Sequence, residues 1–349
     1  MVDAAVIISW VGFVLMIPLL ALAEHRVVRS KGRVMKYHLY FAGVTLVGIL
    51  LLPSSAKHAI YSPLGVLIIG TVFPIYESIR AVCTPGGEDD KSWLMYWVAF
   101  AFVEFPSAWV DDLAEEHQNV YDGWYSFEFF FFLWLLLPWT DGACVLYDFI
   151  GEPLCAPLIK PIAAKCDNVI GGLVSAVMSA SHLWFLWGIF LFFPPTWKRF
   201  LTVAVGVVYP LMASLVALTT EDTYDDDTFW LTYWSCYGCL YLIMDFLETW
   251  LGRIPGFYTV VLFSSVYLML PIMRGAEKVF RNILVPLAGL QEMLLVRDAL
   301  LVKKEMMKQL TPEQASKVKK VVAESFGKAD DDDDEENDPL LNYGSVNVV

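Results

Sequence analysis

Long apolar segments alternate with short polar connections along most of the chain. A helix rises 1.5 Å per residue, so crossing a bilayer core of about 30 Å takes about 20 apolar residues. Several segments are shorter, and Tyr125–Leu137, which ends before Pro138, would cover only roughly 20 Å. The pattern predicts an all-α polytopic membrane protein built of short helical hairpins. The apolar segments are Ala4–Ala23, His38–Leu52, Leu64–Val82, Trp93–Val110, Tyr125–Leu137, Leu173–Phe193, Phe200–Leu218, Phe229–Leu251 and Phe257–Leu270.

The same pattern occurs twice in the chain. Val72–Ser78 leads through an acidic loop to Trp93–Trp97, and Val208–Ser214 leads through a second acidic loop to Trp230–Trp234. Such repeats in register indicate two tandem units of one fold. Each copy then has a proline followed by a Gly-Ala pair, beginning with Pro138 and Gly142 in the first copy and with Pro271 and Gly275 in the second.

The repeat and the flanking composition divide the chain into regions. The basic residues that follow the first apolar segment indicate the cytosolic side of the membrane, because positive charge is retained there. The connection 111–123 has acidic and no basic residues, which indicates the opposite side. We expect a membrane helix and a basic cytosolic segment over residues 1–36, the first unit over 37–165, the second unit with a closing amphipathic helix over 166–310, and an acidic, disordered cytosolic tail over 311–349.

A stretch with helical spacing of apolar residues closes each unit. In the second unit these residues are Val279, Phe280, Ile283, Leu284 and Leu287, with Lys278 and Arg281 beside them. They predict an amphipathic helix in the headgroup plane of the cytosolic leaflet, or a helix that packs on the protein's own core. Pro286 and Gly289 should kink or split it. The corresponding stretch Gly142–Ile162 holds several prolines, so we expect a shorter helix there.

The composition supports a membrane protein and excludes some other classes. Hydrophobic residues make up 57% of the chain and its mean hydropathy is +0.54, whereas soluble domains have about 45–50% apolar residues. The net charge of −14 comes in large part from the acidic tail, and no basic cluster suits nucleic acid. Cys236 and Cys239 lie in an apolar segment without further ligands at metal spacing, so we expect them to pack there, and we expect no metal or cofactor.

The residues shared by the two copies resemble those of the receptor expression-enhancing protein (REEP) family, which includes Yop-type and deleted-in-polyposis proteins. The first copy follows the family pattern at Pro74, Tyr76, Ser78, Arg80, Trp93, Tyr96, Trp97, Glu104, Tyr125, Trp134, Pro138 and Gly142. The second copy follows it at Pro210, Ser214, Trp230, Tyr233, Trp234, Asp245, Tyr258, Pro271 and Gly275. Arg80 replaces a lysine of the family, and the second copy has no positive charge at that position.

The resemblance implies a non-enzymatic protein that generates or stabilises the high curvature of endoplasmic-reticulum tubules. In that family role, the hairpins act as wedges in the bilayer and the amphipathic helix inserts into it, and both would generate the curvature. The implied partners are membrane lipids and other membrane-shaping proteins, in homo- or hetero-oligomers, and the implied topology is multi-pass with a cytosolic C-terminus. Most family members have one such unit, so a tandem pair could reproduce within one chain the dimer of single-unit relatives.

Other interpretations stay open. The tail could dock cargo receptors, which would make the chain a trafficking adaptor, and its sorting-like patterns would favour endosomal or vacuolar membranes. Repeated membrane units with embedded carboxylates also suit a channel or transporter, although structural hydrogen bonding is the alternative for Glu104, Asp245 and Glu248. The paired Trp and Tyr residues could fix helix depth at the membrane interface, or pack among the helices.

Overall fold

The computed structural model describes residues 34–85, 88–116, 118–162, 188–219, 224–252, 254, 256–270 and 273–309. Every regular element in these residues is a helix, which confirms the all-α prediction. The first apolar segment, the basic residues after it up to Arg33 and the acidic tail lie outside them. Two predicted site features, Pro271 and the side chain of Glu104, also lie outside the described part of the chain.

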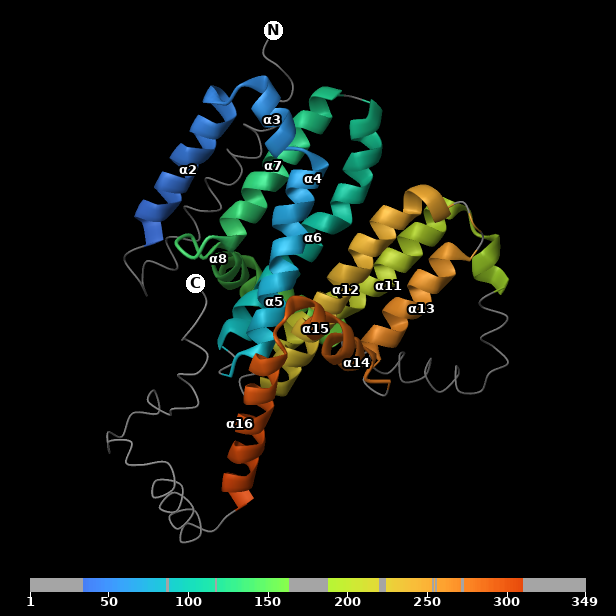
Figure 1. The fold of residues 1–349 in the computed structure, drawn as a ribbon. Coiled ribbons are helices and arrows are strands. Elements are labelled where there is room, and N and C mark those ends of the chain that lie inside the picture. Colours follow the sequence, from blue (N-terminus) through green and yellow to red (C-terminus); the bar gives the residue numbers. More distant parts are fainter. Residues whose placement is uncertain are drawn as a thin grey trace.

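The first unit is a bundle around three helical legs (Figure 1). Its first leg is continuous from Pro63 to Cys83 and packs against the second leg, which in turn packs against the third. The elements are α2 (Val34–Leu51), α3 (Ser54–Ile60), α4 (Pro63–Leu67), the π-helical turn η1 (Ile68–Val72), α5 (Phe73–Cys83), α6 (Glu88–Glu116), α7 (Gln118–Leu136), α8 (Gly142–Leu146) and the π-helical segment η2 (Tyr147–Cys155).

The second unit repeats this plan. Its three legs α11, α12 and α13 pack against one another, and a turn after α13 leads into the closing helices. The elements are α11 (Pro195–Ala217), α12 (Tyr224–Leu251), α13 (Phe257–Met269), α14 (Gly275–Val279), the π-helical turn η3 (Phe280–Leu284), α15 (Val285–Ala288) and α16 (Gln291–Gln309). The two sequence copies therefore fold into equivalent bundles.

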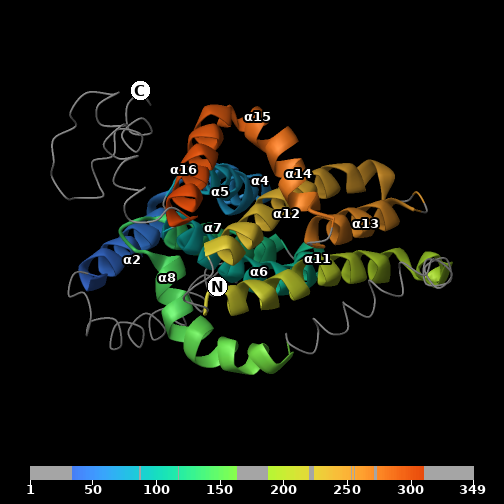
Figure 2. The ribbon, with the colours of Figure 1, turned by 90° about the horizontal axis from the view of Figure 1, so that it is seen from below.

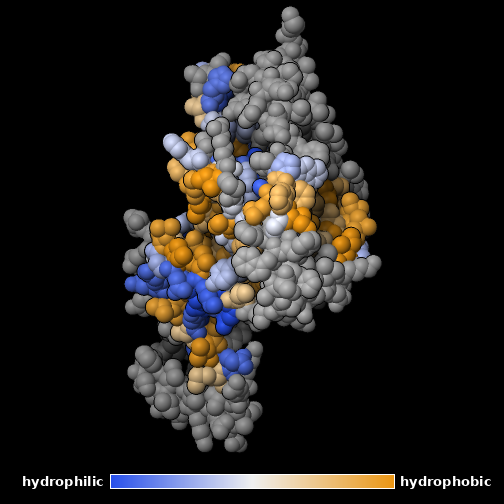
Figure 3. Space-filling model, turned by 90° about the vertical axis from the view of Figure 1, so that its right-hand side faces the viewer, coloured by the Kyte–Doolittle hydropathy of each residue, from blue (hydrophilic) through white to orange (hydrophobic). Residues whose placement is uncertain are grey.

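Apolar helices of two lengths support a membrane location. In the described residues, three helices are long and apolar enough to cross a membrane, namely Pro63–Cys83, Gly142–Ile162 and Trp197–Ala217. Three shorter apolar helices are Tyr40–Leu51, Gly123–Leu136 and Phe257–Met269, as the sequence predicted. Figure 3 shows apolar side chains over the middle of one face and hydrophilic side chains gathered below them. Such exposed apolar area suits a lipid environment.

The helix that closes the first unit corrects one prediction. Gly142–Ile162 is continuous over 21 residues and is not shortened by its prolines. Pro153 lies inside η2, where the wider π-helical turns relieve the contact between a proline ring and the carbonyl four residues before it. The side chains of Pro153, Pro157 and Pro161 are all exposed. The expected shortening does not occur, because π-helical turns accommodate a proline that a regular α-helix would not.

The closing segment of the second unit is split, as predicted. The helix ends at Ala288, Gly289 adopts a left-handed conformation with φ of 73°, and α16 starts anew at Gln291. Some of its apolar residues pack into the protein core and others lie on the surface. Phe280 and Leu284 are buried in the core, whereas Ile283 and Leu287 are exposed. Core packing therefore accounts for one half of the predicted amphipathic face, and the other half remains available to lipid.

The contacts between the two units are reciprocal. In the middle of the molecule, α5 of the first unit packs against α12 of the second, and α11 packs against α6. The closing helices also cross over, because η2 contacts α11 while α15 and α16 contact α5. Figure 2 shows α16 lying beside α5. Such mutual contacts are those of a two-fold dimer, here within one chain.

Candidate functional site

Each unit has a proline in its first leg whose missing hydrogen bond is replaced by a tyrosine. Pro210 carries no N–H, so it cannot donate to the carbonyl of Gly206 four residues before it. The Tyr233 hydroxyl donates to that carbonyl at 2.7 Å. In the first unit, the Tyr96 hydroxyl donates to the Gly70 carbonyl at the same distance. A buried carbonyl without a donor would be unfavourable, and the tyrosine removes that penalty.

One turn further along each first leg, a serine holds the tryptophan next to that tyrosine. The Trp97 indole N–H donates to Ser78 Oγ at 2.9 Å, and the Trp234 indole N–H donates to Ser214 Oγ at 2.9 Å. Both serines are fully buried and both indoles are at most 1% exposed. The Pro-Ser pair of the first leg and the Tyr-Trp pair of the second leg thus fix the two legs in register.

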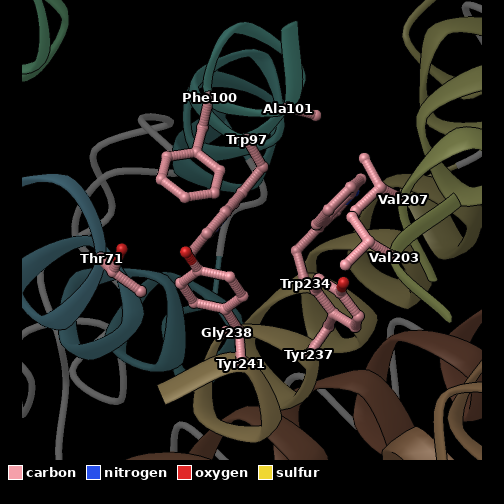
Figure 4. A pocket seen from close by; sticks show the side chains of 10 residues that line it. All are labelled: Thr71, Trp97, Phe100, Ala101, Val203, Val207, Trp234, Tyr237, Gly238 and Tyr241. Carbon is pink, nitrogen blue, oxygen red and sulfur yellow. The ribbon is translucent and has the colours of Figure 1, made fainter. Parts of the chain in front are cut away.

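The two indoles meet at the seam between the units. The rings of Trp97 and Trp234 are stacked at a centroid distance of 6.1 Å and an interplanar angle of 5°. Figure 4 shows a small, mainly apolar pocket beside them, lined from η1, α6, α11 and α12. Gly238 lies in this lining, and a Cβ atom there would meet the Trp97 ring and the Ile75 side chain. Close approach of the units therefore needs a glycine at this position.

The Gly-Ala pairs form a second duplicated feature. Asp141 and Arg274 are non-glycine residues with left-handed backbones, at φ of 46° and 49°, and each precedes the glycine of its pair. A Cβ on Gly142 would meet the Trp134 carbonyl, and one on Gly275 would meet the Tyr267 carbonyl. Glycine is therefore needed where the chain folds sharply back onto the preceding leg.

The comparison with known families follows the same two units. The family model described as "TB2/DP1, HVA22 family" matches residues 74–154 and again 210–287. The stretch matched in each unit is one of the TB2/DP1, HVA22 family. This confirms the resemblance drawn from the repeated residues. The matches lie inside the unit boundaries expected from the sequence, and those boundaries themselves stay a prediction.

Individual relatives cover one part of the chain each. Receptor expression-enhancing protein 2 of Homo sapiens is 39% identical over 107 residues, which is 30% of this chain and 39% of the relative. Receptor expression-enhancing protein 6 of Danio rerio is 28% identical over 155 residues, which is 43% of this chain and 64% of the relative. Protein yop1 of Emericella nidulans is 35% identical over 87 residues, which is 25% of this chain and 48% of the relative. No solved structure matches the chain significantly.

The remaining family positions lie around this core. Pro74, Pro210, Trp134 and Tyr258 are buried, and Trp93, Tyr125 and Trp230 are partly buried. Tyr76, Arg80, Pro138 and Asp245 are exposed, and Arg80 forms a surface ion pair with Glu77 at 3.7 Å. Full burial of Tyr96, Trp97, Tyr233 and Trp234 favours packing over interface anchoring for these four aromatic residues.

Glu248 has the structural role that its sequence context left open. Its Oε1 accepts a hydrogen bond from the Tyr258 hydroxyl at 2.8 Å, and its Oε2 lies 3.6 Å from Arg199 Nε. The three residues come from α12, α13 and α11. The carboxylate therefore joins all three legs of the second unit at the end opposite the acidic loop.

Sequence reasoning missed Gly70 and Gly206, whose carbonyls receive the tyrosine hydroxyls. A glycine four residues before each repeated proline was the available signal. The tyrosine, tryptophan and serine polar groups of this site form hydrogen bonds that join the first and second legs of each unit. In the described residues, no three His, Cys, Asp or Glu side chains are grouped so that they could hold a metal ion.

Proposed function

We propose that this chain is a non-enzymatic membrane-shaping protein of the endoplasmic reticulum. Two family units are joined through the stacked Trp97 and Trp234 into a single body, and this joint carries the proposal. Several apolar helices, such as Phe257–Met269 with 13 residues, are too short to cover a bilayer core of about 30 Å. Such helices enter one leaflet more than the other, which makes the pair of hairpin bundles act as a wedge.

The closing helices of the second unit extend this wedge. Ile283 and Leu287 are exposed, at 57% and 82%, and Lys278 is exposed beside them. Arg281 is tied to α16 by a bidentate contact with Asp298, with nitrogen–oxygen distances of 2.6 and 3.2 Å. We infer that this surface lies against the anionic cytosolic leaflet, where exposed apolar side chains enter the headgroup region. Its partners are then lipids and other copies of membrane-shaping chains.

Reconstitution into large liposomes tests the proposal. Electron microscopy at rising protein-to-lipid ratio should show narrow tubules or small vesicles in proportion to protein. Large vesicles that keep their shape at every ratio would contradict intrinsic membrane shaping.

Two exposed residues test the contribution of the closing helices. Ile283→Glu with Leu287→Glu should reduce tubulation severalfold, because charges would replace the lipid-facing apolar atoms. Met306→Glu, at an exposed residue near the end of α16, is the matched control. Deletion of Gly275–Leu310 is a poorer test because it removes the buried Phe280 and Leu284. Equal tubulation by the double variant and the control would exclude this surface.

A trafficking adaptor is the second candidate, favoured by the words "receptor expression-enhancing" in the names of the relatives. We infer that such a role would use the tail 330–349. Its removal should then abolish recruitment of cargo receptors and leave tubulation unchanged. Loss of tubulation on removal of the tail would argue against separate segments for cargo recruitment and membrane shaping.

A further inference from the structure

Two aspartates from equivalent positions meet at the loop end of the seam between the units. Asp90 precedes Trp93 by three residues in the first turn of α6, and Asp227 precedes Trp230 by three residues in the first turn of α12. Asp90 is only 1% exposed, and its Oδ2 accepts a hydrogen bond from Thr228 Oγ1 at 2.6 Å. Since Thr228 belongs to the second unit, this bond joins the units.

The charges around the second aspartate repeat this arrangement. Lys91 follows Asp90 just as Thr228 follows Asp227, so these two residues are equivalent in the repeat. Lys91 lies near enough to Asp227 to act on the pKa of that carboxyl. Asp90 therefore bonds to the residue that follows Asp227, and Asp227 lies within electrostatic range of the residue that follows Asp90. The charge of Asp90 also acts on Asp227, which places the two carboxyl groups in one electrostatic site.

Neither carboxyl group is fully satisfied. The Oδ1 atoms of Asp90 and Asp227 are both buried and have no hydrogen-bond partner among the described residues. Buried ionised carboxylates with an unbonded oxygen are unfavourable, and a second carboxylate nearby adds repulsion. A bound proton relieves both effects, because it neutralises one of the two carboxylates.

We propose that Asp90 and Asp227 form a proton-operated lock between the two units, in which gain of a proton tightens the contact between the first turns of α6 and α12 and its loss loosens that contact. The proposal goes beyond membrane shaping and does not depend on it. The charge of Lys91 also acts on Asp148 of η2. The titratable and charged groups around the pair are Asp89 and Lys91 of α6, Asp226 of α12, Arg297 of α16, Tyr147 of η2 and Cys83 of α5.

The direction of the pH response follows from burial. Desolvation raises the pKa of Asp227 to about 6, although the charge of Lys91 lowers it. Desolvation also raises the pKa of Asp90 above its ordinary value, although the hydrogen bond from Thr228 and the charge of Arg297 lower it. Because the closed contact holds the proton more tightly, protonation favours the closed contact. This stabilisation is complete below the ordinary aspartate pKa of about 3.9 and is lost as the pH rises through about 6.

Hydrogen–deuterium exchange on the full chain in lipid nanodiscs, corrected for intrinsic exchange rates, measures this response. Between pH 7.5 and pH 5, amides in the first two turns of α6 and α12 should become about three- to tenfold more protected, since solvent screening and the helix dipoles reduce the full linkage effect. Asp90→Asn and Asp227→Asn cannot ionise, so each should raise protection at pH 7.5 and the double variant should remove the pH response.

Asp245→Asn is the matched control, because Asp245 is an exposed aspartate of α12 whose charge acts on neither Asp90 nor Asp227. It should keep the response of the unmodified chain. The proposed lock is contradicted if the unmodified chain shows no pH-dependent protection in these turns, or if the double variant responds as the unmodified chain does. The pH series on the unmodified chain decides the matter even where a variant folds poorly.

Discussion

Trp234→Ala is expected to lower the free energy of unfolding by about 3–5 kcal/mol and to separate the two units. The substitution removes a fully buried indole, its stacking on Trp97 and its hydrogen bond to Ser214. It also leaves the Ser214 hydroxyl without its donor in the core. A loss of this size is a large part of the 5–15 kcal/mol that stabilises a typical domain.

Chemical unfolding in micelles measures this loss, and cross-linking between α5 and α12 measures the separation. Trp197→Ala is the matched control, because Trp197 is 57% exposed and lies outside the seam. The control should change stability by no more than about 0.5 kcal/mol. Equal effects of the two substitutions would mean that the stacked pair does not hold the units together.

Tyr233→Phe should destabilise the second unit by about 1–3 kcal/mol, because it leaves the buried Gly206 carbonyl without a donor. Pro210→Ala restores an N–H four residues after that carbonyl, so a regular helical hydrogen bond can replace the tyrosine. In the Pro210→Ala background, Tyr233→Phe should therefore have a much smaller effect. The expected coupling between the two positions is at least about 1 kcal/mol.

A double-mutant cycle of unfolding free energies measures this coupling. Tyr267→Phe, at a partly exposed tyrosine of α13, controls for loss of a hydroxyl as such. Additive effects of Tyr233→Phe and Pro210→Ala would show that the hydroxyl does not stand in for the proline's missing donor. The result bears on both units, because Tyr96 and Gly70 repeat the contact.

The repeated motif was visible in the sequence, but its physical meaning was not. Spacing alone allowed the aromatic pairs to lie at the membrane interface or in the core. The choice depended on what lies opposite them, and the opposing groups are Gly70, Ser78 and their counterparts on the first legs. The glycine four residues before each repeated proline marks the position in the sequence, but which hydroxyl reaches its carbonyl depends on how the second leg packs on the first.

The sequence by itself determined the properties that depend on local chemistry. Apolar content and segment length specified a helical membrane protein, the repeat specified two units, and Pro286 with Gly289 specified a break in the closing helix. Each of these follows from hydropathy or from the backbone limits of one residue. The tertiary structure alone decided how the units meet. The stacked indoles and the bond from Thr228 to Asp90, residues 138 positions apart, depend on the packing of whole helices, which no local pattern records.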